Sequence, residues 1–145
     1  MEPLLISACL LGVGCRYDGQ SRPLPDRELC RLKKAYTLIP VCPELYGGLP
    51  TPRPPAERQG EKVVTRDRTD VTAAYLRGAE EVLRLAALLE CRKALLKERS
   101  PSCGKGKIYD GSFCGRLISS DGILAGRLTA VGIAVFGESE LNRLL

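Results

Sequence analysis

The stretch PLLISAC, residues 3–9, is a short apolar run that ends in a cysteine. Its length and its lack of polar alternation are typical of a strand that is buried on both faces, as in a parallel sheet. The pattern returns at YTLIPVC, residues 36–42, and a third run, CRKALLKE at residues 91–98, leads into RSPSCG. A fourth run, IAVFG at residues 133–137, has no cysteine after it. These runs predict four strands.

Helical patterns alternate with the strands. Residues 26–35 begin with an aspartate that suits a helix start, and apolar residues recur at a spacing of three and four from residue 69 to 89. Two further helices are expected at 119–132 and 138–145. This alternation predicts an α/β fold, a small Rossmann-like parallel sheet of about four strands flanked by helices.

Two segments have other patterns. Residues 42–65, which follow the second strand, are rich in proline and glycine, and we expect them to form a long irregular loop without regular structure. Residues 107–115, KIYDGSFCG, predict a hairpin that turns at Asp110 and Gly111.

Length and composition limit the protein class. The 145 residues predict a single domain over residues 1–145, and no apolar run reaches the roughly 20 residues that cross a membrane. The net charge of +5 is spread over clusters without interleaved aromatic residues, so we expect no nucleic-acid partner. The acidic second residue argues against a signal peptide, and we expect a cytoplasmic protein.

Cysteine usage is the most informative feature of the composition. The chain has seven cysteines and no histidine. An odd number in a chain expected to be cytosolic disfavours a disulfide framework and favours metal binding or catalysis. Without histidine, a site for a soft metal must rely on thiolates, with or without a carboxylate.

Three cysteines share one position in the pattern. Cys9, Cys42 and Cys103 each follow a different predicted strand. The carboxyl ends of parallel strands meet at one edge of a sheet, so these three thiolates are expected to converge on a metal there. No C-x₂-C pair typical of structural zinc is present, which favours an iron–sulfur cluster with one open iron, although zinc and a metal-free site remain open.

The other cysteines have simpler interpretations. Cys30 and Cys91 are expected to be small buried hydrophobic side chains, and Cys114 is expected to be structural. Cys15 lies in a glycine-rich loop six residues after Cys9 and is a possible fourth ligand. A closed four-thiolate site would favour an alternative function, a non-enzymatic iron–sulfur or zinc module that serves as a sensor or sulfur carrier.

Polar residues near the expected site supply acid–base chemistry. Glu44 lies two residues beyond Cys42 and is a candidate general base, or else a loop acid that binds a backbone N–H. Ser100 and Ser102 are candidates to donate a hydrogen bond to a ligand, or to stabilise the turn. Arg53 sits among prolines and is a candidate to bind a carbonyl or carboxylate of a substrate, with a surface ion pair as the alternative.

Three motifs resemble a known family. ISACLLGVGCRYDG, PVCPELYGGLPTPRPPAE and LKERSPSCGKGKIYDGSFCG occur in this order across nearly the whole chain. Together they closely resemble the DUF523 family, and the resemblance extends over the single domain. It implies an oxygen-sensitive [4Fe-4S] cluster held by Cys9, Cys42 and Cys103.

The resemblance also implies an activity. It is the non-redox desulfuration of thiouracil-like thiolated pyrimidines, with release of hydrogen sulfide. The thiocarbonyl sulfur would bind the open iron, Glu44 would activate water, and Ser100 would help to move a proton. The small-molecule substrate would also contact Ser102 and Arg53.

Overall fold

Strand β1 lies inside a parallel sheet, with a hydrogen-bonded neighbour on each side. The computed structural model describes residues 1–145. The sheet has the order β2–β1–β5–β8, with β1 (Glu2–Ser7), β2 (Tyr36–Val41), β5 (Lys93–Leu96) and β8 (Ala134–Gly137). Leu5 of β1 lies opposite Ile39 of β2 and Ala94 of β5. The predicted α/β fold with four parallel strands is confirmed.

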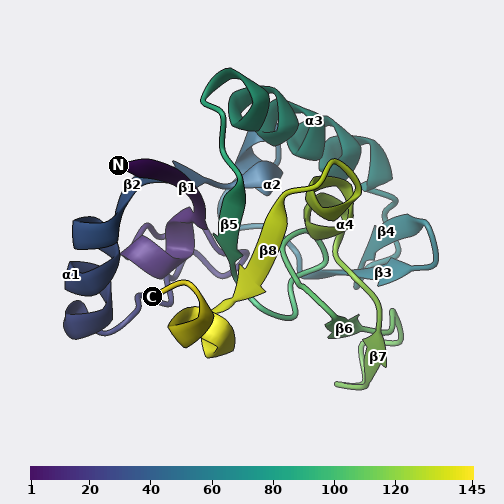
Figure 1. Cartoon of the computed structure of the whole chain (residues 1–145). Coiled ribbons are helices and arrows are strands. Elements are labelled where there is room, and N and C mark those ends of the chain that lie inside the picture. Colours follow the sequence, from purple (N-terminus) through teal and green to yellow (C-terminus); the bar gives the residue numbers. More distant parts are fainter.

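Helices cover both faces of this sheet (Figure 1). One face packs against α3 (Thr72–Leu88) and α4 (Ile123–Ala130), and the other against α1 (Asp26–Ala35) and a C-terminal 3₁₀ helix (Glu138–Arg143). Successive side chains of a strand point to opposite faces. Leu5 therefore joins the core under α3, whereas Leu4 and Ile6 join the core under α1.

Most helix boundaries agree with the sequence pattern. Helix α1 has the predicted bounds, and the acidic residues in its first turn and lysines in its last turn interact favourably with the helix dipole. Helix α3 begins at Thr72, three residues later than expected, and the Thr72 N–H donates a 2.9 Å hydrogen bond to the carboxylate of Asp70. The last helix is of the 3₁₀ type and ends at Arg143.

The prediction that residues 42–65 have no regular structure was wrong in part. Helix α2 (Pro43–Tyr46) begins with a proline, which suits the first position of a helix. Strands β3 (Ala56–Gln59) and β4 (Lys62–Thr65) form an antiparallel hairpin, and its turn contains Gly60 at φ +63°. The irregular part of this segment is chiefly residues 47–55, which connect α2 to β3.

The second hairpin is longer than its sequence indicated. Strand β6 (Lys107–Tyr109) pairs with β7 (Leu117–Ser119), so the predicted turn at Asp110 and Gly111 is the start of a loop over residues 110–116. Both hairpins lie beyond the same end of the sheet (Figure 1).

Helices α2 and α3 pack unusually closely. A Cβ atom added at Gly78 would lie 1.8 Å from the carbonyl oxygen of Pro43, and one added at Gly47 would lie 2.0 Å from that of Ala74. Only glycine permits this approach. The contact places α3 directly against the helix that follows Cys42. No helix of the structure has the length and apolar character needed to cross a membrane.

The strand order creates a topological switch point. From β1 the chain moves to β2 on one side, then returns to β5 on the other side of β1. Connections leave the sheet in opposite directions at this point, which opens a crevice beyond the carboxyl ends of the strands.

Candidate functional site

A cavity of about 510 Å³ opens beyond the carboxyl ends of β1, β2 and β5. Its wall is formed by the loops that follow these strands and by parts of both hairpins. The cavity therefore lies at the switch point, where the topology of the sheet predicts a ligand.

The structure brings Cys9, Cys42 and Cys103 together on the wall of this cavity. Cys9 lies in a 3₁₀ helix (Ala8–Leu11) directly after β1, and Cys42 lies between β2 and α2. Cys103 lies in the turn that follows β5. Cys9 and Cys103 are buried, whereas Cys42 is half-buried. All seven cysteines are free thiols. Cys91 is buried as predicted, whereas Cys30 is exposed on α1, so its predicted burial was wrong.

The three thiols do not form a ready-made site for a single metal ion. No group of three Cys, Asp or Glu side chains is arranged to hold a single metal ion. In an iron–sulfur cluster each cysteine binds a different iron, so its ligands need only border a common cavity. Three thiols on one cavity wall are compatible with this kind of ligation.

Burial controls the ionisation of the three thiols. It raises the pKa of Cys9 to about 11, and it raises the pKa of Cys103 well above its ordinary value, with the charge of Glu44 adding to the effect at Cys103. The pKa of Cys42 is raised by its interaction with the Cys15 thiol and by burial. Without a metal the three thiols hold their protons, so metal binding would release them.

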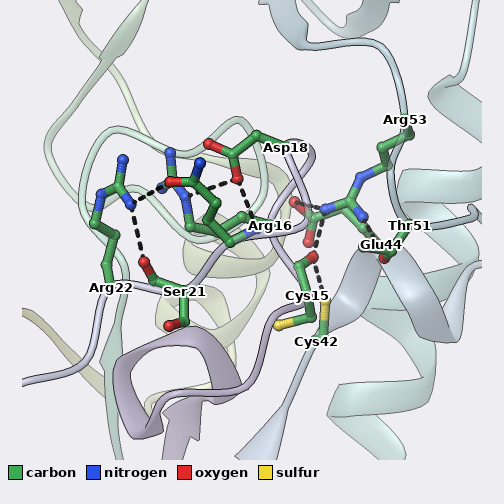
Figure 2. A network of polar contacts seen from close by, with 10 residues as sticks. Cys15, Arg16, Asp18, Ser21, Arg22, Cys42, Glu44, Thr51 and Arg53 are labelled. Carbon is green, nitrogen blue, oxygen red and sulfur yellow. Dashed lines mark hydrogen bonds and ion pairs between the residues drawn. The ribbon is translucent and has the colours of Figure 1, made fainter.

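Cys15 also lines the cavity and contacts Cys42. The Cys42 sulfur lies 3.9 Å from the carbonyl oxygen of Cys15 (Figure 2). The pKa of Cys15 is lowered, chiefly by the interaction with the Cys42 side chain.

Glu44 lies in the first turn of α2 and lines the cavity. Its side chain is 12% exposed. Burial raises the pKa of Glu44 above its ordinary value, and the Arg53 guanidinium opposes this effect. A buried carboxylate with a raised pKa is a stronger base than one in water.

Arg53 is held by protein atoms on several sides (Figure 2). Its Nη2 atom lies 3.9 Å from Oε2 of Glu44 and donates a 3.0 Å hydrogen bond to the carbonyl oxygen of Cys15. Its Nη1 atom donates to Pro50 and Thr51, and only 7% of the side chain is exposed. The ion pair between Arg53 and Glu44 is therefore largely shielded from solvent and is not the surface pair considered as the alternative. Arg53 lines the cavity, but its donors are largely used by the protein.

The two predicted serines occupy different environments. Ser100 lines the cavity, and its Oγ accepts hydrogen bonds from the N–H groups of Ser102 and Cys103 at 3.1 and 3.0 Å. Its own hydrogen remains free to donate. Ser102 does not line the cavity: it is fully buried, and its hydroxyl has no partner. We therefore leave Ser102 out of the proposed substrate site.

Sequence reasoning missed two features of the wall. Acidic side chains on the wall are outnumbered by basic ones, which come from Arg16, Arg22, Arg53, Arg66, Lys97 and Arg99. This wall favours an anionic or electron-rich small molecule. Four of the seven aromatic residues in the chain also line the cavity, namely Tyr17, Tyr75, Tyr109 and Phe113.

Comparison with known proteins identifies the family. The model of the 2-thiouracil desulfurase family matches residues 4–140. The chain belongs to this family of enzymes. The DUF523 resemblance of the three motifs is thereby confirmed.

Two relatives cover almost the whole chain. A solved structure named as the [4Fe-4S]-dependent thiouracil desulfidase TudS is 50% identical, with a TM-score of 0.95 over 99% of this chain and 95% of its own. The uncharacterized protein YbbK of Bacillus subtilis (strain 168) is 41% identical over 98% of this chain and 99% of its own length. The TudS structure therefore shares the fold described above.

Proposed function

We propose that this protein is a [4Fe-4S]-dependent desulfidase that replaces the thiocarbonyl sulfur of a thiouracil-like pyrimidine with oxygen. The observation that carries the proposal is one cavity that joins three cysteines from three strand ends to a buried carboxylate. A solved relative that is 50% identical is named as an enzyme of this kind. In the overall reaction, the thiocarbonyl compound and water give a carbonyl compound and hydrogen sulfide.

The donor set of the cavity fits the cluster. Cys9, Cys42 and Cys103 would hold it, because they are free thiols on a common wall and no histidine competes with them. When bound by three thiolates, the cluster supplies one open iron, a Lewis acid with affinity for a soft sulfur atom.

The side chains of the protein supply the proton transfers. Glu44 takes a proton from a water molecule directed at the thiocarbonyl carbon, and its burial strengthens it as a base. Arg53 holds the Glu44 carboxylate in place. Ser100 already accepts two backbone hydrogen bonds through Oγ, so its hydrogen is free to be donated to a substrate atom.

The proposal includes the setting of the enzyme. We expect one iron–sulfur domain over residues 1–145 that acts on a small molecule and not on nucleic acid or a membrane. Seven free thiols suit a reducing compartment, so we place the enzyme in the cytoplasm.

Anoxic turnover of 2-thiouracil tests this function. Protein reconstituted with iron and sulfide should release uracil and sulfide in equal amounts, and Glu44→Gln should keep the cluster while losing turnover. A fully loaded wild-type protein that forms neither product from thiouracils would reject this substrate class.

A second candidate function rests on Cys15. Its position on the cavity wall, in contact with Cys42, would allow a closed four-thiolate site without an open iron. Such a protein would be a sensor or a sulfur carrier. Cys15→Ser discriminates between the two: it should destroy cluster loading in a closed site and largely spare it in the desulfidase.

A further inference from the structure

Tyr75 is a buried residue whose hydroxyl has no hydrogen-bond partner in the protein. It lies in the first turn of α3, is 3% exposed and lines the cavity. Its hydroxyl oxygen makes no hydrogen bond, yet it is not sealed from solvent. Buried tyrosine hydroxyls usually find a partner. The missing partner of Tyr75 therefore belongs to whatever fills the cavity.

Tyr36, a second buried tyrosine of this chain, has hydrogen-bond partners for its hydroxyl. Tyr36 is 5% exposed and packs on the opposite face of the sheet. Its hydroxyl donates a 2.7 Å hydrogen bond to the carbonyl oxygen of Leu144 and accepts one from Nζ of Lys93 at 3.4 Å. The two tyrosines are equally buried, and only the one on the cavity lacks a partner.

The surroundings of Tyr75 are the groups proposed to carry the reaction. The close contact of Gly78 with Pro43 holds this part of α3 against the helix that carries Glu44. Tyr75 also shares a core cluster with Cys103. Burial raises the pKa of Tyr75, and the charge of Glu44 adds to the effect. The hydroxyl therefore keeps its hydrogen at neutral pH and is available as a donor.

We propose that the Tyr75 hydroxyl donates a hydrogen bond to a sulfur atom held in the cavity. The proposal rests on the desulfidase function and adds a donor to it. Two sulfur sources fit the same chemistry: a sulfur of the bound cluster, or the thiocarbonyl sulfur of the substrate. Hydrogen bonds to cluster sulfurs raise the reduction potential of an iron–sulfur site, which gives a readout that is independent of turnover.

The variant Tyr75→Phe removes only the hydroxyl and keeps the ring in the core. Tyr36→Phe is the matched control, because it deletes the hydroxyl of a similarly buried tyrosine that does not line the cavity. In urea unfolding of the cluster-free proteins, Tyr36→Phe should lower stability, since it leaves the Leu144 carbonyl unpaired. Tyr75→Phe should leave stability unchanged or raise it. A loss at Tyr75→Phe equal to that at Tyr36→Phe would show a partner within the protein and overturn the proposal.

The loaded proteins separate the two sulfur sources. If the hydroxyl binds a cluster sulfur, Tyr75→Phe shifts the midpoint potential to more negative values and alters the visible spectrum in the absence of substrate. If it binds the substrate sulfur, the potential stays unchanged and KM for 2-thiouracil rises by roughly three- to tenfold, the effect of one neutral hydrogen bond. Tyr36→Phe should match the wild type in both measurements.

The outcomes also distinguish a failure of the proposed role of Tyr75 from a failure of the desulfidase function on which it rests. An active wild type whose Tyr75→Phe variant has the same potential, spectrum, KM and kcat overturns the role of Tyr75 alone. A wild type that binds no cluster, or is loaded and produces no sulfide, overturns the desulfidase function and the role of Tyr75 with it.

Discussion

Nη2 of Arg53 lies 3.9 Å from Oε2 of Glu44 and also donates a 3.0 Å hydrogen bond to the carbonyl oxygen of Cys15. The backbone N–H of Arg53 donates to the carbonyl oxygen of Tyr17 at 2.9 Å. Arg53 therefore connects the loop after β1 to the helix after β2. We propose that Arg53 positions the proposed base and the loop that contains Cys15.

Replacing Arg53 should therefore damage turnover more than substrate binding. Arg53→Met removes the charge beside a buried carboxylate and the hydrogen bond to Cys15, so we expect kcat for 2-thiouracil to fall at least tenfold, about 1.4 kcal/mol. Arg53→Lys keeps the charge but not the forked geometry and should recover part of this loss. Steady-state kinetics at equal iron content measures both. If the Arg53 variants raise KM and leave kcat unchanged, Arg53 is a substrate contact and not a positioning residue.

Cluster loading should depend on three cysteines and not on the rest. Replacement of Cys9, Cys42 or Cys103 by serine should each abolish stable loading, since each would remove one of three ligands. Cys15→Ser should retain most of the iron, as should the exposed control Cys30→Ser. Iron analysis after anoxic reconstitution measures this series. Equal losses at Cys15 and Cys42 would favour the closed four-thiolate site.

The raised pKa of Glu44 predicts a pH dependence of stability. Burial raises this pKa above the ordinary value of 4.5, so the folded cluster-free protein binds the proton more tightly than the unfolded chain does. The stability from this group is fully present below pH 4.5 and is lost as pH rises through the folded pKa. Glu44→Gln removes the effect, so the variant should gain stability relative to the wild type across that range. Urea unfolding at several pH values tests this, and a difference independent of pH would contradict it.

Glu57 joins the two hairpins on the cavity wall. Its Oε1 atom accepts hydrogen bonds from the N–H groups of Gly111 and Phe113 at 3.0 and 3.1 Å. Glu57→Ala should lower the free energy of unfolding by about 1–3 kcal/mol, because two N–H groups lose a charged acceptor. Hydrogen exchange at residues 111–113 should become faster.

Two variants control this prediction. Glu57→Gln keeps an acceptor oxygen and should recover part of the loss, whereas Glu61→Ala, at an exposed position of the same hairpin, should have little effect. Similar stabilities of Glu57→Ala and Glu61→Ala would show that the hairpins are held by other contacts.

The central sheet could be predicted because it is encoded locally. The apolar runs of β1 and β2 are bounded by polar or turn residues, and the rule that parallel strands end at one edge then brings Cys9 and Cys42 to the same cavity. Repeating patterns of this kind need no knowledge of tertiary contacts.

The parts that escaped prediction depend on contacts between distant segments. The β3–β4 hairpin is held by Glu57 and by the 2.6 Å hydrogen bond from Arg58 to the carbonyl oxygen of Asp121. Ser102 is buried because the N–H groups at Leu124 and Ala125 bind its carbonyl oxygen. Tyr75 fits the apolar period of its helix, so its hydroxyl gave no separate signal.

The most direct test of the account is the iron and acid-labile sulfide content of the protein purified without oxygen. A cluster held by Cys9, Cys42 and Cys103 predicts about four iron and four sulfide per chain, with the broad visible absorption of a four-iron cluster. Zinc in place of iron, or thiols that bind no metal under these conditions, would contradict it.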